Sequence, residues 1–71
     1  MFKIEKIKAG DIVTLKKDIK TQNDFFQKGE TLLVSYVGLF SADLEDKEKP
    51  TRWVTDVNIR DLELLLRGEK N

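Results

Sequence analysis

Cysteine and histidine are both absent from this chain of 71 residues, which contains one proline, one tryptophan and one tyrosine. Without cysteine the chain has no disulfide and no thiolate nucleophile, and without histidine it has no imidazole for metal binding or acid-base catalysis. A domain of this size buries only ~60% of the surface of its unfolded chain. We therefore expect one domain over residues 1–71, stabilised by the packing of its few apolar side chains alone.

Long apolar runs are also missing. The longest, TLLVSYVGLF and LELLL, are far shorter than the ~20 residues that span a bilayer. The N-terminal stretch MFKIEKIKAG alternates charged and apolar residues, unlike a signal peptide. We therefore expect a cytoplasmic protein that does not contact membranes. Ten lysines against three arginines indicate a bacterium, a phage or another mobile element as the source.

The charges balance but are unevenly placed. Thirteen basic and thirteen acidic residues give a net charge of zero, yet residues 1–28 carry seven lysines against four acids, and residues 29–71 carry nine acids against six bases. Dedicated nucleic-acid-binding domains usually have a net positive charge. The balance therefore favours a protein partner, while the N-terminal half leaves a local basic face, and hence nucleic-acid binding, as an alternative.

Alternating apolar residues predict a series of short strands. These strands are expected at FKIEKI, IVTLKK, ETLLVSYV, LFSADLED and RWVTDV. The polar stretch EDKEKPTR contains Pro50 and is predicted to be a loop. Residues 58–66 have two interpretations: a short helical turn that Asn58 caps, followed by a strand, or a C-terminal helix that Gly68 ends.

The strand pattern also predicts a core. Tyr36 is expected on the same face of its strand as Leu32 and Val34. Gly29 follows a long polar excursion, so we expect it to have a positive φ angle or to sit where no side chain fits. The residues predicted to share one core are Val13, Leu15, Leu32, Val34, Val54 and Leu62.

The segments AGDIVTLKKDI, FFQKGETLLVSYV, RWV and DLELL resemble the small SH3-like β-barrels of bacteria and phages, including KOW-like modules. The resemblance covers roughly residues 8–65 and implies a mainly β barrel of about five antiparallel strands, with a short helical turn before the last strand and a flexible tail at 66–71. The ALYDY-like stretch and binding proline of signalling SH3 domains are missing, so recognition of proline-rich peptides does not carry over. Gly29 lacks the basic surroundings of a KOW motif.

Aromatic residues are the first candidates for partner binding. Phe25 and Phe26 are adjacent, so in extended backbone they point to opposite sides. We expect one in the core, and the other either under the long loop or in an exposed patch with Tyr36 or Trp53. Trp53 is read either as half-buried scaffold or as a stacking platform for a base or a partner side chain.

Lysines around the first loop are the second candidates. They form either a solvated face or a basic rim that holds phosphates or an acidic protein surface. These residues are Lys16, Lys17, Lys20 and Lys28.

No catalytic or metal signature appears in the sequence. The acids at 43–48 lack the spacing of a calcium-binding loop, and no nucleophile lies at a useful spacing from a base. We therefore predict a non-enzymatic binding or adaptor module without a cofactor. A protein is the expected partner, nucleic acid is the alternative, and the oligomeric state is left open.

Overall fold

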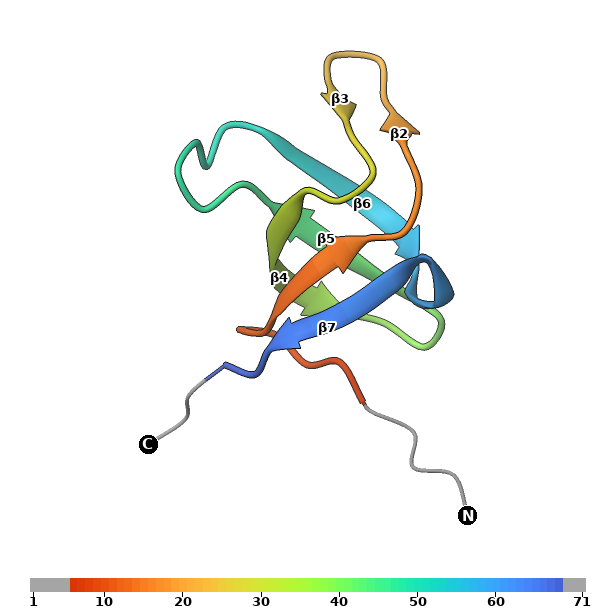
Figure 1. Ribbon diagram of the computed structural model, residues 1–71, viewed down its shortest axis with the longest axis vertical. Coiled ribbons are helices and arrows are strands. Elements are labelled where there is room, and N and C mark those ends of the chain that lie inside the picture. Colours follow the sequence, from red (N-terminus) through yellow and green to blue (C-terminus); the bar gives the residue numbers. More distant parts are fainter. Residues whose placement is uncertain (1–5, 69–71) are drawn as a thin grey trace.

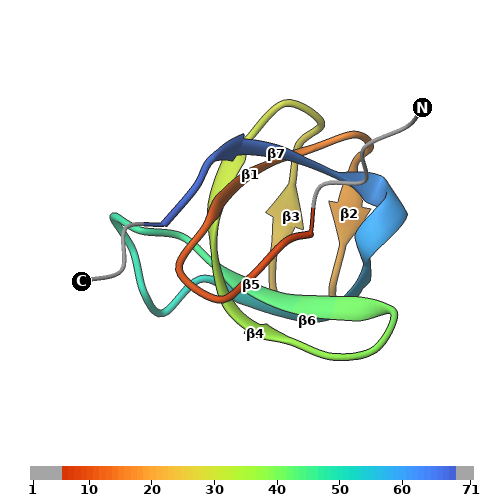
Figure 2. The same cartoon turned by 90° about the horizontal axis from the view of Figure 1, so that it is seen from below.

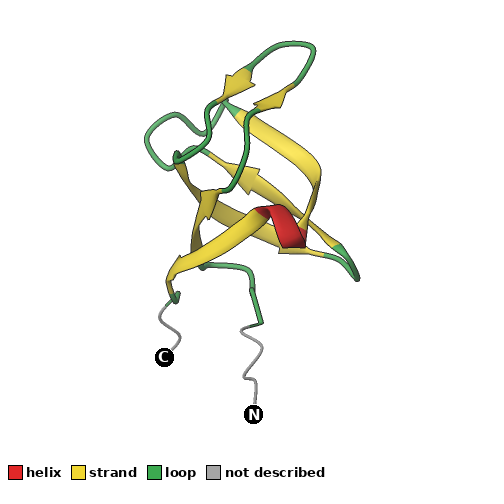
Figure 3. Ribbon diagram, turned by 45° about the vertical axis from the view of Figure 1, so that its right-hand side comes forward, coloured by secondary structure: helices red, strands yellow, loops and turns green. Residues whose placement is uncertain are grey.

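A computed structural model of the chain describes residues 6–68 and shows a mainly β protein (Figures 1 and 3). The prediction of strands separated by turns is confirmed, although the lead-in strand at 2–7 falls mostly outside the described residues. Lys6 and Ile7 precede the first strand without joining the sheet. The elements are β1 (Ile12–Leu15), β2 (Ile19–Lys20), β3 (Phe25–Phe26), β4 (Thr31–Val37), β5 (Ser41–Glu45), β6 (Trp53–Asn58), the 3-10 helix η1 (Ile59–Asp61) and β7 (Leu62–Leu66).

Five of the strands form one antiparallel sheet in the order β6-β5-β4-β1-β7. The sheet curls, so that β1 and β7 lie across the interior from β5 and β6 (Figure 2). The strand order is linear, with β6 and β7 at the two edges, so the sheet is open and hydrogen bonds do not close it into a barrel. β2 and β3 follow β1 and precede β4 along the chain. They pair with each other as a separate two-stranded ribbon.

The C-terminal segment is a helical turn followed by a strand, so the alternative of a C-terminal helix is wrong. The Asn58 side chain accepts a hydrogen bond from the backbone N–H of Arg60, which begins η1. The chain then extends, because Leu62 pairs with Leu15 and enters the core. Leu66 is the last residue of β7, and residues 69–71 of the predicted flexible tail lie outside the described part.

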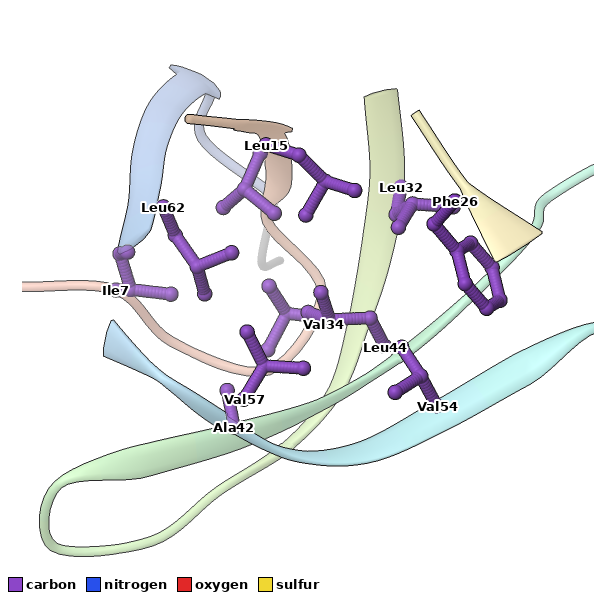
Figure 4. Close-up of a cluster of buried hydrophobic side chains, with 11 residues drawn as sticks. Ile7, Leu15, Phe26, Leu32, Val34, Ala42, Leu44, Val54, Val57 and Leu62 are labelled. Carbon is purple, nitrogen blue, oxygen red and sulfur yellow. The ribbon is translucent and has the colours of Figure 1, made fainter. Parts of the chain in front are cut away.

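The core lies inside the curled sheet (Figure 4). All six side chains predicted to share a core are buried, which confirms their inward facing on four strands. β3 adds Phe26, which packs over the open end of the sheet with no exposed surface. The other buried apolar residues are Ile7, Ala42, Leu44 and Val57.

β-bulges change the facing of residues in the sheet. Ser35 is an extra residue in β4, because Val34 pairs with Leu44 and Tyr36 with Asp43. One extra residue reverses the alternation of a strand. The prediction that Tyr36 shares the core face of Val34 is therefore wrong: Tyr36 is exposed, and Val37 packs against the core instead.

Glycines and a buried carboxylate shape the turns beside β1. Gly29 has φ of 93°, which confirms its prediction, and Gly10 has φ of 99°. Asp11 is buried, and its carboxylate accepts hydrogen bonds from the backbone N–H groups of Lys8 (2.8 Å) and Gly68 (2.6 Å). Asp11 therefore ties the segment before β1 to the segment after β7.

Candidate interaction surfaces

Arg52 fixes the β2–β3 ribbon to the rest of the fold. Its guanidinium donates two parallel hydrogen bonds to Glu30, of 2.9 and 3.0 Å, and one of 2.7 Å to the backbone oxygen of Phe25. It also bonds Asp46 at 3.0 Å and lies 4.2 Å from the centre of the Phe26 ring. One side chain thus joins the ribbon, the start of β4 and both ends of the β5–β6 loop.

This cluster perturbs the charges of its members. The hydrogen bond from Arg52 lowers the pKa of Glu30 below its ordinary value. The pKa of Asp46 is also lowered, chiefly because its carboxylate accepts a bond from the backbone N–H of Glu48. The side-chain hydrogen bonds of Arg52 with Glu30, chiefly, and with Asp46 raise the pKa of Arg52. All three groups are therefore held in their charged forms at neutral pH.

The two phenylalanines of β3 point in opposite directions, as predicted. Phe26 is fully buried, so the structure removes it from the candidate contact residues: its ring is the core plug under Arg52. Phe25 is 50% exposed and is the cross-strand partner of Lys20. Directly opposite residues of an antiparallel pair project from the same face. Lys20 and Phe25 therefore form a cation and an aromatic ring side by side on the outer face of the ribbon.

Trp53 lies at the same end of the molecule as the ribbon. It is 57% exposed at the start of β6. With Thr51, Val54 and Thr55 it faces the tip of the ribbon, 21–24, across a groove of about 260 Å³. This exposure is compatible with both interpretations of Trp53, as half-buried scaffold and as a contact residue.

Tyr36 lies away from Trp53, so the two do not form a single aromatic patch. Tyr36 lines a different groove, beside the segment that precedes β1 and the turn between β4 and β5. Its cross-strand partner is Asp43, whereas that of Trp53 is Glu45. The candidate aromatic residues are thus divided between two ends, the ribbon end with Phe25 and Trp53, and the hairpin end with Tyr36.

The four candidate lysines are exposed but do not share one groove. Lys16 lines a groove along β7, whereas Lys17 lines another beside β6 and forms an ion pair of 3.3 Å with Asp61. Lys20 accompanies Phe25 on the ribbon, and Lys28 lies in the turn that follows β3. The structure therefore brings only Lys20 together with a candidate aromatic residue.

Sequence reasoning missed two exposed apolar residues, Leu39 and Phe40. The sequence assigned them to a strand at 39–46, but β5 begins at Ser41, and the N–H of Gly38 bonds the oxygen of Ser41 across a two-residue turn. Leu39 is 85% and Phe40 75% exposed. Gly38 was the available signal, because a glycine after a predicted strand marks a turn.

One acidic side chain of the sheet, that of Asp43, has a structural partner. The Asp43 carboxylate accepts a hydrogen bond from the N–H of Asp56, whose φ of 62° marks a bulge in β6.

The part of the chain that the structure describes, residues 6–68, contains no helix with the length and apolar character needed to span a membrane. Comparison with known proteins adds no relative: no family model, no curated protein and no solved structure matches the chain.

Proposed function

We propose that this protein is a non-enzymatic binding module with an SH3-like architecture, and that its partner is another protein. The observation that carries the proposal is the exposure of its aromatic residues. Of the five aromatic side chains in residues 6–68, only Phe26 is buried. The other four, each at least half exposed, are Phe25, Tyr36, Phe40 and Trp53.

The topology supports the SH3-like part of the proposal. A two-stranded excursion separates β1 from β4, a 3-10 turn precedes the last strand, and β1 lies between β4 and β7. The turn before the last strand is the feature that the sequence resemblance implies. These features describe an architecture and leave the activity to be argued from the surface.

The exposed part of an aromatic ring does not stabilise the isolated fold, since apolar surface contributes only when it leaves water. Among residues 6–68 one ring is buried and four are at least half exposed, so the domain has apolar surface to offer a partner. Tyrosine and tryptophan are enriched among the residues that dominate binding energies at protein interfaces. The rings sit on paired strands or on a two-residue turn, so little conformational freedom is lost when a partner binds.

Nucleic-acid binding is the second candidate, and the pairing of Lys20 with Phe25 favours it. A cation beside an exposed ring is the combination with which single-stranded nucleic acids are held, by phosphate contact and base stacking. The ion pair between Lys17 and Asp61 argues in the other direction, because it neutralises one of the lysines. We therefore place protein binding first.

Affinity capture from a lysate of the source cell tests the proposal. The bait is the full chain, compared with Phe25→Ala, Tyr36→Ala, Phe40→Ala and Trp53→Ala variants and with Glu63→Ala as a control on an exposed β7 position. We expect a protein that the parent and the control retain and that an aromatic variant loses, with faster dissociation as the cause. The proposal is wrong if no retained protein depends on any of the four exposed rings.

A gel-shift titration separates the second candidate from the first. Random single- and double-stranded DNA and RNA are titrated at low salt, with the parent and with a variant in which Lys16, Lys17, Lys20 and Lys28 are neutral. Binding that is tighter than about 1 µM, weakens steeply with salt and disappears in the variant identifies a nucleic-acid partner. Without such binding, the lysines are expected only to speed association with a protein.

A further inference from the structure

The hairpin end carries a groove of about 630 Å³ between the β4–β5 turn and the segment that precedes β1. Ile7, Tyr36, Val37 and Leu39 contribute its apolar lining, and Lys6 and Lys8 stand on the side of the preceding segment. We call this feature the hairpin groove. Its size is within the range of pockets that hold small ligands or the anchoring side chains of a peptide.

The turn at the edge of the hairpin groove has a composition that folding does not explain. Two-residue hairpin turns favour glycine, asparagine and aspartate, for reasons of backbone geometry. Here the two turn residues are Leu39 and Phe40, the two most exposed large apolar side chains among residues 6–68. Neither contributes to the core, so their apolar surface is available to a partner that covers the turn.

The opposite side of the hairpin groove is held in place by Asp11 and Arg67. The buried carboxylate of Asp11 holds the backbone N–H of Lys8, and the oxygen of Lys8 accepts a bond from the N–H of Asp11. Arg67 donates a hydrogen bond of 3.3 Å to the backbone oxygen of Lys6. Both lysines therefore project from a fixed backbone, which is the preorganisation that favours binding.

The positive charge of the hairpin groove favours an acidic partner. Among the described residues that line it, Lys6 and Lys8 are the charged ones, and both are cationic. We infer that the hairpin groove binds an acidic peptide segment of a partner protein, in which carboxylates pair with Lys6 and Lys8 and an apolar side chain enters between Tyr36 and Leu39. This inference rests on the proposed function, because it assigns the partner's chemistry to one surface.

The shape of the site favours a peptide over a membrane or a nucleic acid. A bilayer surface covers a protruding turn but does not enter a concave groove, and a nucleic acid would pair its phosphates with the lysines while leaving Leu39 in water. A peptide satisfies both features at once, because its side chains alternate between charged and apolar along a single chain.

Selection from a displayed library of random 12-residue peptides, with the full chain as the target, is the first test. We expect the enriched peptides to combine two or more acidic residues with a large apolar one. In ¹⁵N-labelled protein, an enriched peptide should shift the amide signals of Ala9, Val37 and Gly38. Its affinity should fall as sodium chloride is raised, since the ion pairs are exposed.

Charge and apolar variants of the protein supply the second test. Lys6→Glu with Lys8→Glu should weaken the enriched peptide roughly tenfold or more, whereas Lys47→Glu with Lys49→Glu changes the net charge equally on the β5–β6 loop and should leave it unchanged. Leu39→Ser with Phe40→Ser should weaken binding comparably. Its control is Leu65→Ser with Leu66→Ser, which changes two exposed leucines of β7. Unaltered melting curves show that the variants fold.

Several results would overturn the inference. They are a selection that enriches no peptide, enriched peptides that lack acidic residues, and signal shifts confined to the ribbon end. Binding to phosphatidylglycerol vesicles or to random DNA that requires Leu39 and Phe40, without an enriched peptide, assigns the site to those ligands instead. Shifts at the ribbon end still leave the proposed function intact, since that function fails only if no captured protein depends on the exposed rings.

Discussion

Replacing Arg52 with methionine should destabilise the fold strongly for a residue outside the core. The variant keeps the length of the side chain but loses the guanidinium that joins Glu30, Phe25 and the Phe26 ring. A well-formed carboxylate pair at a partly exposed site contributes about 1 kcal/mol. The bond to the Phe25 oxygen adds about 1 kcal/mol, and the cation over the ring about 0.5 kcal/mol. The free energy of unfolding should therefore fall by about 2.5 kcal/mol.

That loss is large, because a domain of this length has a total stability of roughly 4–10 kcal/mol. For so small a domain, it corresponds to a fall in melting temperature of about 10–20 °C. Circular dichroism melts of the two proteins measure it. Arg52→Lys keeps the charge but loses the paired hydrogen bonds, so it should melt between them. Arg60→Met, which alters an exposed arginine of η1, is the matched control and should melt with the parent.

Acid should weaken the Arg52 cluster in a defined range. The folded-state pKa values of Glu30 and Asp46 lie below their ordinary values of 4.5 and 3.8. Their contribution to stability is therefore complete above about pH 5 and is lost as pH falls through the lowered values. The parent should thus lose stability more steeply than Arg52→Met between about pH 5 and pH 2. If Arg52→Met melts within a degree or two of the parent at neutral pH, or if both have the same acid profile, the cluster does not stabilise the ribbon.

Three further changes test the core and the turns. Val34→Ala should lower the free energy of unfolding by about 2 kcal/mol in urea titration, since Val34 is buried in the centre of β4; an unchanged midpoint would refute the register. Gly29→Val should lower the free energy of unfolding by about 1–2 kcal/mol. The positive φ is the cause, since a Cβ at this position meets no other atom, and Gly29→Asn should cost less. Asp11→Ala leaves two backbone N–H groups without their acceptor and should cost about 2 kcal/mol, with faster hydrogen exchange at Lys8 and Gly68; unchanged exchange at both amides would contradict the tie.

Much of the sheet was predictable because its determinants are local in sequence. Leu32 and Val34 alternate with partly exposed neighbours, so the pleat alone places them inside. Gly29 was identified because a turn that needs positive φ favours glycine. Phe25 and Phe26 had to face opposite sides for the same geometric reason, although the sequence could not say which one entered the core.

The features that the sequence did not reveal depend on pairing across the fold. The bulge at Ser35 is defined only against β5, and it turns Tyr36 outward by changing the register after Val34. Arg52 meets Phe25 and Glu30 from positions 27 and 22 residues away. Asp11 resembles an ordinary turn residue until Gly68, 57 residues later, supplies its second donor. Contacts of this kind are invisible to a reading of local pattern.

At each end of the molecule, one charged side chain fixes the backbone through hydrogen bonds. At the ribbon end, Arg52 bonds the backbone oxygen of Phe25 and the carboxylate of Glu30, and it lies over the Phe26 ring. At the hairpin end, the carboxylate of Asp11 holds the backbone beside the hairpin groove. In each case a charged side chain that is at least partly buried is satisfied by several donors or acceptors, and these hydrogen bonds fix irregular backbone. A chain of 71 residues has too few apolar side chains to fix every loop by burial. Polar anchors at both ends thus leave the exposed rings and the Leu39–Phe40 turn outside the core, where the proposed partner would meet them.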